Sequence, residues 1–371
     1  MNPLVESTNA LKLGLFCTNG TGASQTLAPE RHTAPSWERS LRTAQAADVA
    51  GFEAVVPFAR WKGYPEKRPE HSSGMVLDPF TWAAGIAAST ERIGVLATSH
   101  APTLHPIVAA KQAATVDLIS GGRFALNVVG GWNRPELEMF GAPMREHDER
   151  YDHLQEWLEV IRRLWSQTEE FDFHGRFFDV AGGLSQPKPV QPRIPIMNAG
   201  GSPRGMRFAA EHADLCFLIV HAEDEAGIRA QVQGYKDMAR AEFGREVRVW
   251  THTVVVQRNT QAEAEAYHHR FSVEQEDTES VDAWMRLQGA NTELMPPEVL
   301  ATMRQRMAAG AGGFPLVGTP ERIAERLETL SAAGIDGALL TWVDYDAGLT
   351  AFIREVLPLL EKAGMRNAVP A

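Results

Sequence analysis

The stretch RIGVLATSHAPTLHPIVAAKQAATVDLISGGRFALNVVGG, residues 92–131, decides the fold of this chain. Its first apolar run, 92–99, is typical of a buried strand. Residues 105–122 follow with apolar side chains at helical spacing and two glycines as a stop. A second apolar run at 123–131 predicts another strand. A strand–helix–strand unit of this kind favours two parallel strands that are joined by a helix.

The same alternation extends along the whole chain. Apolar runs predict strands at 11–17, 52–58, 92–99, 123–131, 194–201, 213–220, 247–257 and 335–343. Amphipathic helical segments separate them. Eight strand–helix units predict an α/β protein with a (β/α)8 barrel, the TIM barrel. A doubly wound open sheet is the alternative.

Two segments interrupt this alternation. Residues 169–193 are rich in aromatic residues, Gly and Pro, and predict a small β excursion. Residues 258–316 are polar, helix-prone and too long for a connector, and long insertions beside barrel strands usually form lids or binding loops. We therefore expect residues 1–371 to form a single barrel domain with these two additions.

Composition excludes several classes of protein. With 47 acidic against 36 basic residues the formal charge is -11, which argues against a nucleic-acid partner. No apolar stretch approaches the ~20 residues that span a bilayer. The first residues lack the basic and apolar segments of a secretory signal. Two cysteines, Cys17 and Cys216, cannot form a disulfide framework, so we expect a cytoplasmic protein without a membrane partner.

Motifs for several kinds of active site are missing from the sequence. There is no GxxxxGK[ST] loop, and no GxGxxG follows a strand, so a built-in nicotinamide site is not indicated. No HExxH or comparable spacing predicts a metal site. A GxSxG nucleophile elbow is also missing, which disfavours an α/β-hydrolase.

The ends of the predicted strands carry the polar candidates, because a (β/α)8 barrel has its active site there. Gly200-Gly201-Ser202-Pro203-Arg204 combines glycines that let a ligand approach, a capping serine and a possible charge. A helix N-terminus of this kind binds phosphate, although an ordinary strand-to-helix turn is the alternative.

Asn127 lies inside the apolar run FALNVV, where an amide is costly to bury unless it is hydrogen-bonded. A strand-end asparagine that satisfies the backbone is the alternative. Thr98 on the adjacent predicted strand is a weaker candidate. Four tryptophans would suit a flat aromatic ligand if they shared one rim, namely Trp61, Trp132, Trp250 and Trp342.

The segment ATSHAPTLHPIVAAKQAATVDLISGGRFALNVVGGWNRPELEMFG (97–141) resembles bacterial luciferase-like flavin monooxygenases. It is most similar to the branch with pyrimidine, dimethyl sulfone and alkanesulfonate monooxygenases. Supporting stretches occur in the same order from near residue 11 to about residue 360, namely FARWKGY, EHDERYDHLQEWLEVIRRLW, PIMNAGGSPRGMRFAAEHAD and LVGTPERIAERLETLSAAGIDGALLTW. The resemblance thus covers nearly the whole chain.

This resemblance implies a barrel that receives reduced FMN from a separate NAD(P)H-dependent flavin reductase and uses O2. It also implies that Thr98 and Asn127 line the pocket where O2 meets the flavin. The positions that match FMN contacts are Ala59, Arg60, Asn127, Glu136, Arg150, Tyr151 and Ser202. We expect no metal, and a homodimer or homotetramer.

Cationic or potentially cationic side chains lie near the expected mouth of the barrel, namely Arg60, Lys62, Arg134, His221 and His252. They favour a small polar organosulfur substrate, a sulfonate or sulfone. One alternative is ring opening or C–N cleavage of a cyclic amide such as a pyrimidine. Two others are an oxidoreductase that uses the deazaflavin coenzyme F420, and a flavin-binding protein without turnover.

Overall fold

Eight parallel strands form a closed ring in the computed structural model, which describes residues 2–289 and 295–368. Pairing of β8 with β9 and of β11 with β1 closes the ring. The strands are β1 (Lys12–Phe16), β2 (Ala54–Val56), β3 (Gly94–His100), β4 (Phe124–Val129), β7 (Ile196–Asn198), β8 (Leu215–Phe217), β9 (Arg248–Gln257) and β11 (Gly337–Thr341). Each lies within one predicted strand or overlaps it, so the (β/α)8 barrel is confirmed and the open sheet is wrong.

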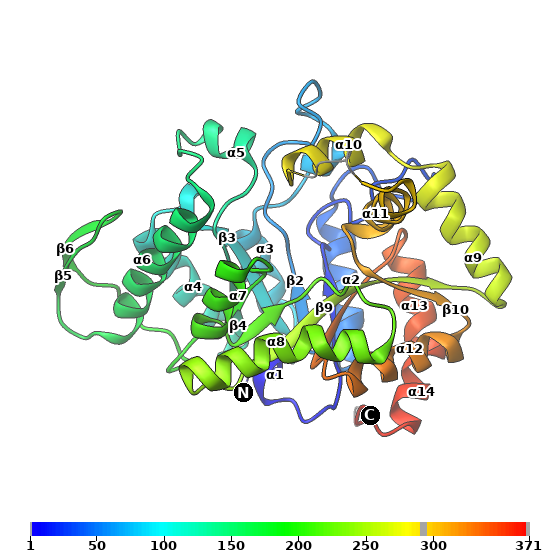
Figure 1. Cartoon of the computed structure of the whole chain (residues 1–371). Helices are drawn as coiled ribbons and strands as arrows, with labels where there is room; N and C mark the ends of the chain where they lie inside the picture. The colour runs from blue at the N-terminus through cyan, green and yellow to red at the C-terminus, as the bar shows by residue number, and fades with distance from the viewer. Residues whose placement is uncertain (1, 290–294, 369–371) are drawn as a thin grey trace.

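Most of the described helices surround this ring on its outer side, whereas α1 (Pro3–Glu6) packs on its inward-facing residues and α10 (Thr278–Leu287) lies beyond its upper end (Figure 1). The other helices are α2 (Trp37–Val49), α3 (Pro79–Ala88), α4 (Pro106–Ser120), α5 (Arg134–Met139), α6 (His147–Ser166), α7 (Pro203–His212), α8 (Glu225–Phe243), α9 (Gln261–His269), α11 (Pro297–Gly310), α12 (Pro320–Ala332), α13 (Tyr345–Glu355) and α14 (Leu357–Lys362). Short helical turns lie at Ser72–Gly74, Ala101–Thr103 and Arg270–Glu274. None of the described helices is long and apolar enough to cross a membrane.

Local sequence explains where these helices begin and end. Ser202 caps α7 by accepting the N–H of Gly205 at 3.1 Å, and Thr319 caps α12 in the same way. Proline occupies the first turn of both helices. Gly121 ends α4 in the left-handed region with φ 62°, which glycine adopts without strain. The strand-to-helix turns are therefore fixed by their own residues.

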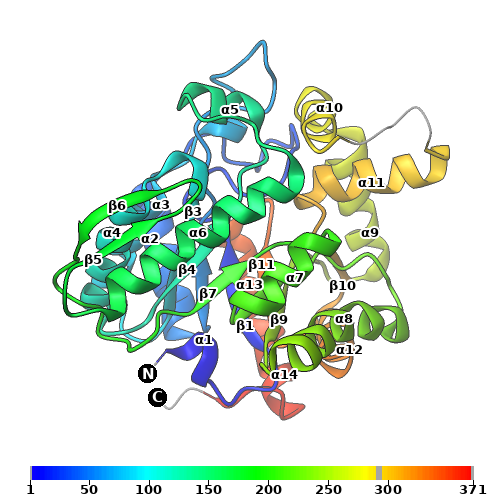
Figure 2. The same cartoon turned by 60° about the vertical axis from the view of Figure 1, so that its left-hand side comes forward.

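Two additions depart from the ring. The hairpin β5 (Phe171–His174) and β6 (Asp179–Gly183) is antiparallel and lies beside α6 (Figure 2). The segment 258–316 contains α9, α10 and α11 and returns as β10 (Phe314–Gly318), parallel to β9. Residues 290–294 of this segment lie outside the described part. The division of the chain into one domain with two additions stays a prediction.

The strand β10 begins inside the segment 258–316, for which the sequence predicts a helix-prone, lid-like insertion and no strand. Its physical cause is the length of β9, the longest strand of the ring at ten residues. On one edge β9 continues past its pairing with β8, which ends at Trp250, and β10 pairs with Thr253 to Gln257 on that edge. An otherwise uncovered strand edge is thereby hydrogen-bonded.

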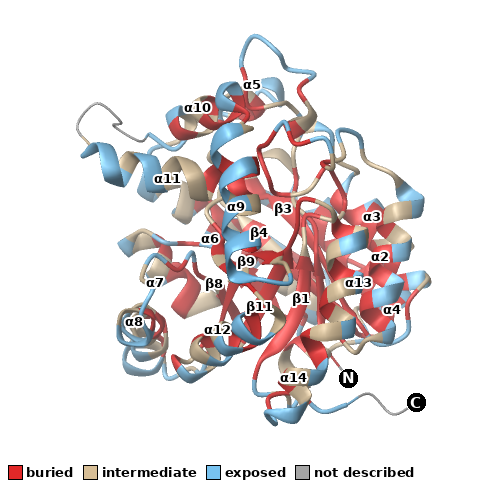
Figure 3. Cartoon of the chain, turned by 90° about the vertical axis from the view of Figure 1, so that its right-hand side faces the viewer, coloured by how far each residue is buried: buried red, intermediate tan, exposed pale blue. Residues whose placement is uncertain are grey.

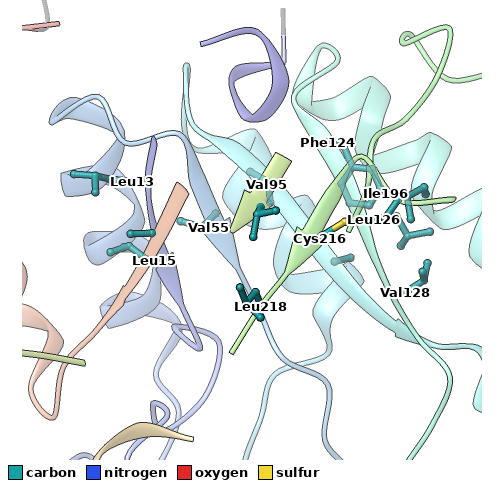
Figure 4. Packing of buried hydrophobic residues seen from close by; sticks show 14 of the residues in the cluster. Leu13, Leu15, Val55, Val95, Phe124, Leu126, Val128, Ile196, Cys216 and Leu218 are labelled. Atoms are coloured by element: carbon teal, nitrogen blue, oxygen red, sulfur yellow. The ribbon is translucent and has the colours of Figure 1, made fainter. Parts of the chain in front are cut away.

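Side chains alternate between the two faces of each strand, which gives the barrel two apolar layers. Outward-facing residues such as Leu13, Val55 and Val95 pack under the helices (Figure 4). Inward-facing residues fill the ring, and Leu4 of α1 packs with them. Trp250 occupies much of this interior, since a Cβ at Gly337 would lie 2.3 Å from its ring. Figure 3 shows the buried strands inside exposed helix faces.

A buried ion pair ties the end of the chain to the first two strands. Arg366 Nη1 lies 2.8 Å from Glu53 Oε2, and both side chains are 4% exposed or less. Arg366 also donates to the carbonyl oxygens of Leu11 at 2.9 Å and Gly51 at 2.7 Å. Glu53 accepts the backbone N–H of Leu13 at 2.8 Å. The other carboxylate oxygen, Glu53 Oε1, accepts from the Ser7 hydroxyl at 2.9 Å and from the Asn9 amide at 2.5 Å, so both charges are fully hydrogen-bonded inside the protein.

Replacing Arg366 with Met should lower the free energy of unfolding by about 3–5 kcal/mol, because Glu53 would stay buried without its cation. Urea unfolding followed by circular dichroism measures the change. Arg354→Met is the matched control, since Arg354 pairs with Glu355 while 68% exposed, and it should cost less than about 1 kcal/mol. Equal costs for both variants would contradict the role of the buried pair.

Candidate functional site

Thr98 and Asn127 lie opposite each other where β3 and β4 approach their carboxyl ends. The Thr98 hydroxyl donates to the carbonyl oxygen of Pro57 at 2.5 Å. It accepts the amide Nδ2–H of Asn127 at 3.1 Å. Because the only hydroxyl proton goes to Pro57, Thr98 can only accept from Asn127, which fixes the orientation of the amide. The buried Asn127 Oδ1 has no partner in the described structure, so it is available to a ligand.

Aromatic side chains share this inner layer of the ring. Phe16 of β1 and Phe217 of β8 lie with ring centroids 5.7 Å apart. The Phe217 ring stacks on His252 of β9 at 5.4 Å. His252 Nε2 lies 3.0 Å from the carbonyl oxygen of Gly310, and burial lowers the pKa of His252 to about 4. At neutral pH His252 is therefore an uncharged donor to Gly310, and it does not contribute to a cationic mouth.

Glu136 of α5 anchors the segment that follows β2. Its side chain is 1% exposed, and its Oε1 accepts the backbone N–H of Trp61 at 2.8 Å and of Lys62 at 3.3 Å. Arg60 Nε lies 3.7 Å from the same oxygen. Glu136 Oε2 is buried without a partner in the described structure. The carboxylate thus holds the backbone next to Arg60 and keeps one acceptor for a ligand.

Arg60 is the buried cation of this group, with its side chain 6% exposed. The guanidinium carbon lies 4.7 Å from the ring centroid of Tyr64 and 4.8 Å from that of Trp132. Its Nε and Nη1 atoms are buried and have no hydrogen-bond partner among the described residues. Burial, together with this cation, lowers the pKa of His100 to about 3. The arrangement presents fixed donors beside a neutral histidine.

Ser202, Arg150 and Tyr151 form a third group, which we call the phosphate corner. The turn before α7 needs its glycine, since a Cβ at Gly200 would lie 2.3 Å from the carbonyl oxygen of Gly205. In contrast, no atom lies within 4 Å of a Cβ placed at Gly201. The first N–H groups of α7 therefore face a place where a ligand has room to approach.

The first turns of α6 supply the other two members of the phosphate corner. The Tyr151 hydroxyl lies against the start of α7, only 2.3 Å from a Cβ placed at Gly205. Burial raises the pKa of Tyr151, so the phenol stays protonated at neutral pH. Arg150 Nη1 donates to the carbonyl oxygen of Gly131 at 3.0 Å, while its Nε is buried without a partner in the described structure.

The structure thus brings the sequence candidates into three groups: Thr98 with Asn127, Arg60 with Glu136, and the phosphate corner. Ala59 is buried directly before Arg60. Arg204 does not add a free charge to the corner, because it pairs with Asp152 at 2.9 Å.

The prediction of four tryptophans at one rim is wrong for two of them. Trp61, 39% exposed, packs against Phe140, and Trp132 lies beside Arg60. Trp250 instead fills the ring, because its position on β9 faces inward and below His252. Trp342 packs against Tyr345 and Phe352. Trp250 is the third residue of β9, near the start of the strand, and Trp342 follows the last residue of β11.

Sequence reasoning gave no role to Tyr64 and Asn198. Tyr64 receives the Arg60 Nη2–H at 3.3 Å. Asn198 donates to the carbonyl oxygen of Val128 at 2.8 Å and accepts the N–H of Gly200 at 3.0 Å, which holds the turn before α7. The position of Asn198 at the end of a predicted strand was the sequence signal that could have indicated this role. No cluster of three or more His, Cys, Asp or Glu in the described ranges could hold a metal ion.

Comparison with known proteins places this geometry in a family. Residues 11–337 match the family model of luciferase-like monooxygenases. The chain is 30% identical to the pyrimidine monooxygenase RutA of Acinetobacter baylyi, over 94% of this chain and 95% of that protein. It is 30% identical to the FMNH(2)-dependent dimethylsulfone monooxygenase of Pseudomonas putida, over 95% and 96% of the two chains.

Solved structures agree on the fold. The long-chain alkane monooxygenase LadA superimposes with a TM-score of 0.83 at 24% identity, over 97% of this chain and 93% of that chain. The family model matches most of the chain, and relatives at 30% identity match over nearly their whole length. This chain belongs to the luciferase-like monooxygenase family.

Proposed function

We propose that this chain is the oxygenase of a two-component system. It takes reduced FMN from a separate NAD(P)H-dependent flavin reductase and uses O2 to oxidise and cleave a small polar substrate. The observation that carries the proposal is the Thr98–Asn127 pair, which leaves a buried, oriented amide oxygen at the carboxyl ends of the strands. The FMNH(2)-dependent relative from Pseudomonas putida supports the choice of cofactor.

The residues of this site suit FMN in their chemistry. A phosphate is held best by helix N–H groups and a charged donor, and the phosphate corner offers the start of α7, the Tyr151 hydroxyl and the unpartnered Arg150 Nε. Buried Asn127 Oδ1 and Glu136 Oε2 are acceptors without partners, which suit the N–H groups of a flavin ring. Reduced FMN supplies the electrons for oxygen activation.

The side chains of the site orient the groups that we assign to the cofactor. Thr98 holds the Asn127 amide, so Thr98 is a positioning residue, and Asn127 is the group that we assign to the cofactor. His100 and His252 are neutral above about pH 5, because burial lowers their pKa values to about 3 and 4. Fixed dipoles, rather than titrating histidines, therefore define the electrostatics of this site.

For the substrate we favour an organosulfur compound, a sulfonate or sulfone. Sulfonyl oxygens only accept hydrogen bonds, and the unpartnered Nε and Nη1 atoms of Arg60 only donate. Because Glu136 balances the charge of Arg60, recognition depends on these donors more than on net charge.

A cyclic amide such as a pyrimidine is the second candidate. Two pyrimidine monooxygenases of the RutA type, from Acinetobacter baylyi and Klebsiella pneumoniae, are 30% and 32% identical to this chain. A pyrimidine carries carbonyl acceptors, and the Nε and Nη1 atoms of Arg60 are donors without hydrogen-bond partners in the described structure. A substrate panel separates the two classes.

We also propose a cytoplasmic location and a homodimer or homotetramer. Both cysteines are buried free thiols, which suits a reducing compartment. Helix α4 leaves apolar side chains exposed that a second subunit could cover, namely Ile107, Val108, Leu118 and Ile119.

The central test is oxygen uptake by the purified chain with FMN reduced by a separate reductase. We expect consumption of O2 with release of hydrogen peroxide, and product formation from sulfones or sulfonates in a panel that also contains uracil. Product from uracil alone would assign the cyclic amide instead. Oxidation of NADH by the chain and FMN without a reductase would contradict the two-component proposal, and no O2 dependence would favour an F420-type or non-catalytic protein.

Arg150→Ala should weaken FMN binding about ten- to a hundredfold, the worth of one charge-assisted hydrogen bond, and leave riboflavin binding nearly unchanged. Anaerobic titration of both reduced flavins measures this. Arg204→Ala is the matched control, because Arg204 already pairs with Asp152, and it should change FMN affinity less than threefold. Equal losses for FMN and riboflavin in Arg150→Ala would remove the assignment of the corner to phosphate.

Thr98→Val keeps the volume of the side chain but removes the acceptor for the Asn127 amide. We expect product formation to fall by about tenfold or more, the worth of one neutral hydrogen bond, while reduced-flavin affinity stays within a fewfold. Thr98→Ser should restore the parental ratio of product to hydrogen peroxide. Parental turnover by Thr98→Val, or a defect confined to FMN affinity, would refute this role.

A further inference from the structure

A groove of about 440 Å3 lies on the outer side of the barrel, between α9 and α13. We call it the outer groove. The end of β9 and the segment after β11 complete its walls, and none of the residues assigned above to flavin lines it. Figure 1 places α9 and α13 on the same side of the barrel. Its volume falls within the range of about 300–1,000 Å3 that is usual for small-molecule sites.

One wall of the outer groove is cationic. The Arg258 guanidinium carbon lies 3.7 Å from the ring centroid of Tyr267, which holds the side chain in place. Its Nη1 donates to the carbonyl oxygen of Gln257 at 2.7 Å. Within residues 2–289 and 295–368, Arg258 has no carboxylate partner within 4.0 Å.

The other charges that line the outer groove are already engaged. Arg270 pairs with Glu30 at 2.7 Å. The carboxylate of Asp344 caps α13 by accepting the N–H of Asp346 at 3.0 Å and of Ala347 at 3.2 Å. Asp344 keeps its negative charge at the start of α13, and Arg258 is the lining cation that no carboxylate of the described residues pairs with.

The opposite wall is apolar and made of small residues. Ala347, Gly348 and Ala351 lie on one face of α13, and Val343 precedes them. Trp342, 4% exposed, closes this wall. Its indole Nε1 is buried without a partner in the described structure and lies 2.7 Å from a Cβ placed at Gly348. The Trp342 ring thus packs directly on Gly348, in the place that a side chain would take, and its N–H donor on this wall of the outer groove has no acceptor in the described structure.

We propose that the outer groove binds a small amphipathic anion. Arg258 pairs with its carboxylate, sulfonate or phosphate group, the Trp342 N–H adds a donor, and the apolar body of the ligand packs on Ala347, Gly348 and Ala351. The proposal depends on the outer groove alone and is independent of the flavin chemistry. A buried N–H without an acceptor and an unpaired arginine are both costly to a free protein, and one anion satisfies both.

The test uses two fluorescent probes with similar apolar bodies, of which one is anionic. 8-Anilino-1-naphthalenesulfonate carries a sulfonate, and N-phenyl-1-naphthylamine has none. Titration of the full chain should give saturable binding of the sulfonate at one site, at least tenfold tighter than the neutral probe. Saturating FMN should leave this binding in place.

Matched variants locate the bound probe. Arg258→Gln should remove the preference for the sulfonate, whereas Arg354→Gln, which removes an exposed arginine of α13 that does not line the outer groove, should stay within threefold of the parent. Ala351→Leu fills the apolar wall and should weaken both probes at least tenfold, and Ala347→Leu serves if that variant does not fold by circular dichroism. Equal parental affinity for both probes, retained preference in Arg258→Gln, or displacement by FMN would each overturn the proposal.

Discussion

Closure of eight parallel strands into one ring is the constraint on which the rest of this structure depends. Parallel strands that close must all end at the same rim, so every strand-to-helix turn is delivered to one place. The register of β3 with β4 then sets Thr98 directly beside Asn127. The same closure brings the start of α7 to the first turns of α6, where the phosphate corner forms. Residues that are far apart in the sequence become one site because the strands have no alternative order.

Much of this could be predicted from the sequence, because the deciding signals are local. Apolar runs and capping residues specify the eight strands and the turn at Ser202 without reference to any partner. The contact between Arg60 and Glu136 is different, since it joins two loops of the ring and only the family resemblance pointed to both residues. Strand β10 was missed because its existence depends on how far β9 continues past the ring, which no local pattern encodes. Trp250 was misplaced because it lies near the start of β9, at the end of the ring opposite to the rim where the strands end.

The site that results is built from fixed hydrogen-bonding groups. Arg60 is balanced by Glu136 and His100 is held neutral by burial beside the cation. The Asn127 amide is fixed by a threonine whose own proton is committed to the backbone. Groups of this kind do not have to reorganise when charge develops during a reaction, which is the main electrostatic advantage of an enclosed site over water. The protein therefore supplies orientation and a low-dielectric surface, and leaves electron transfer to the cofactor.

The return of β10 along β9 has a consequence for how such proteins diversify. The segment with α9, α10 and α11 leaves the barrel at the end of β9 and re-enters beside that same strand. Its two attachment points are therefore neighbours, held by one short ladder of backbone hydrogen bonds. Insertion, deletion or recombination between these points changes the cap of the barrel without shifting the register of any other strand. A segment attached in this way can be exchanged or grafted as one unit.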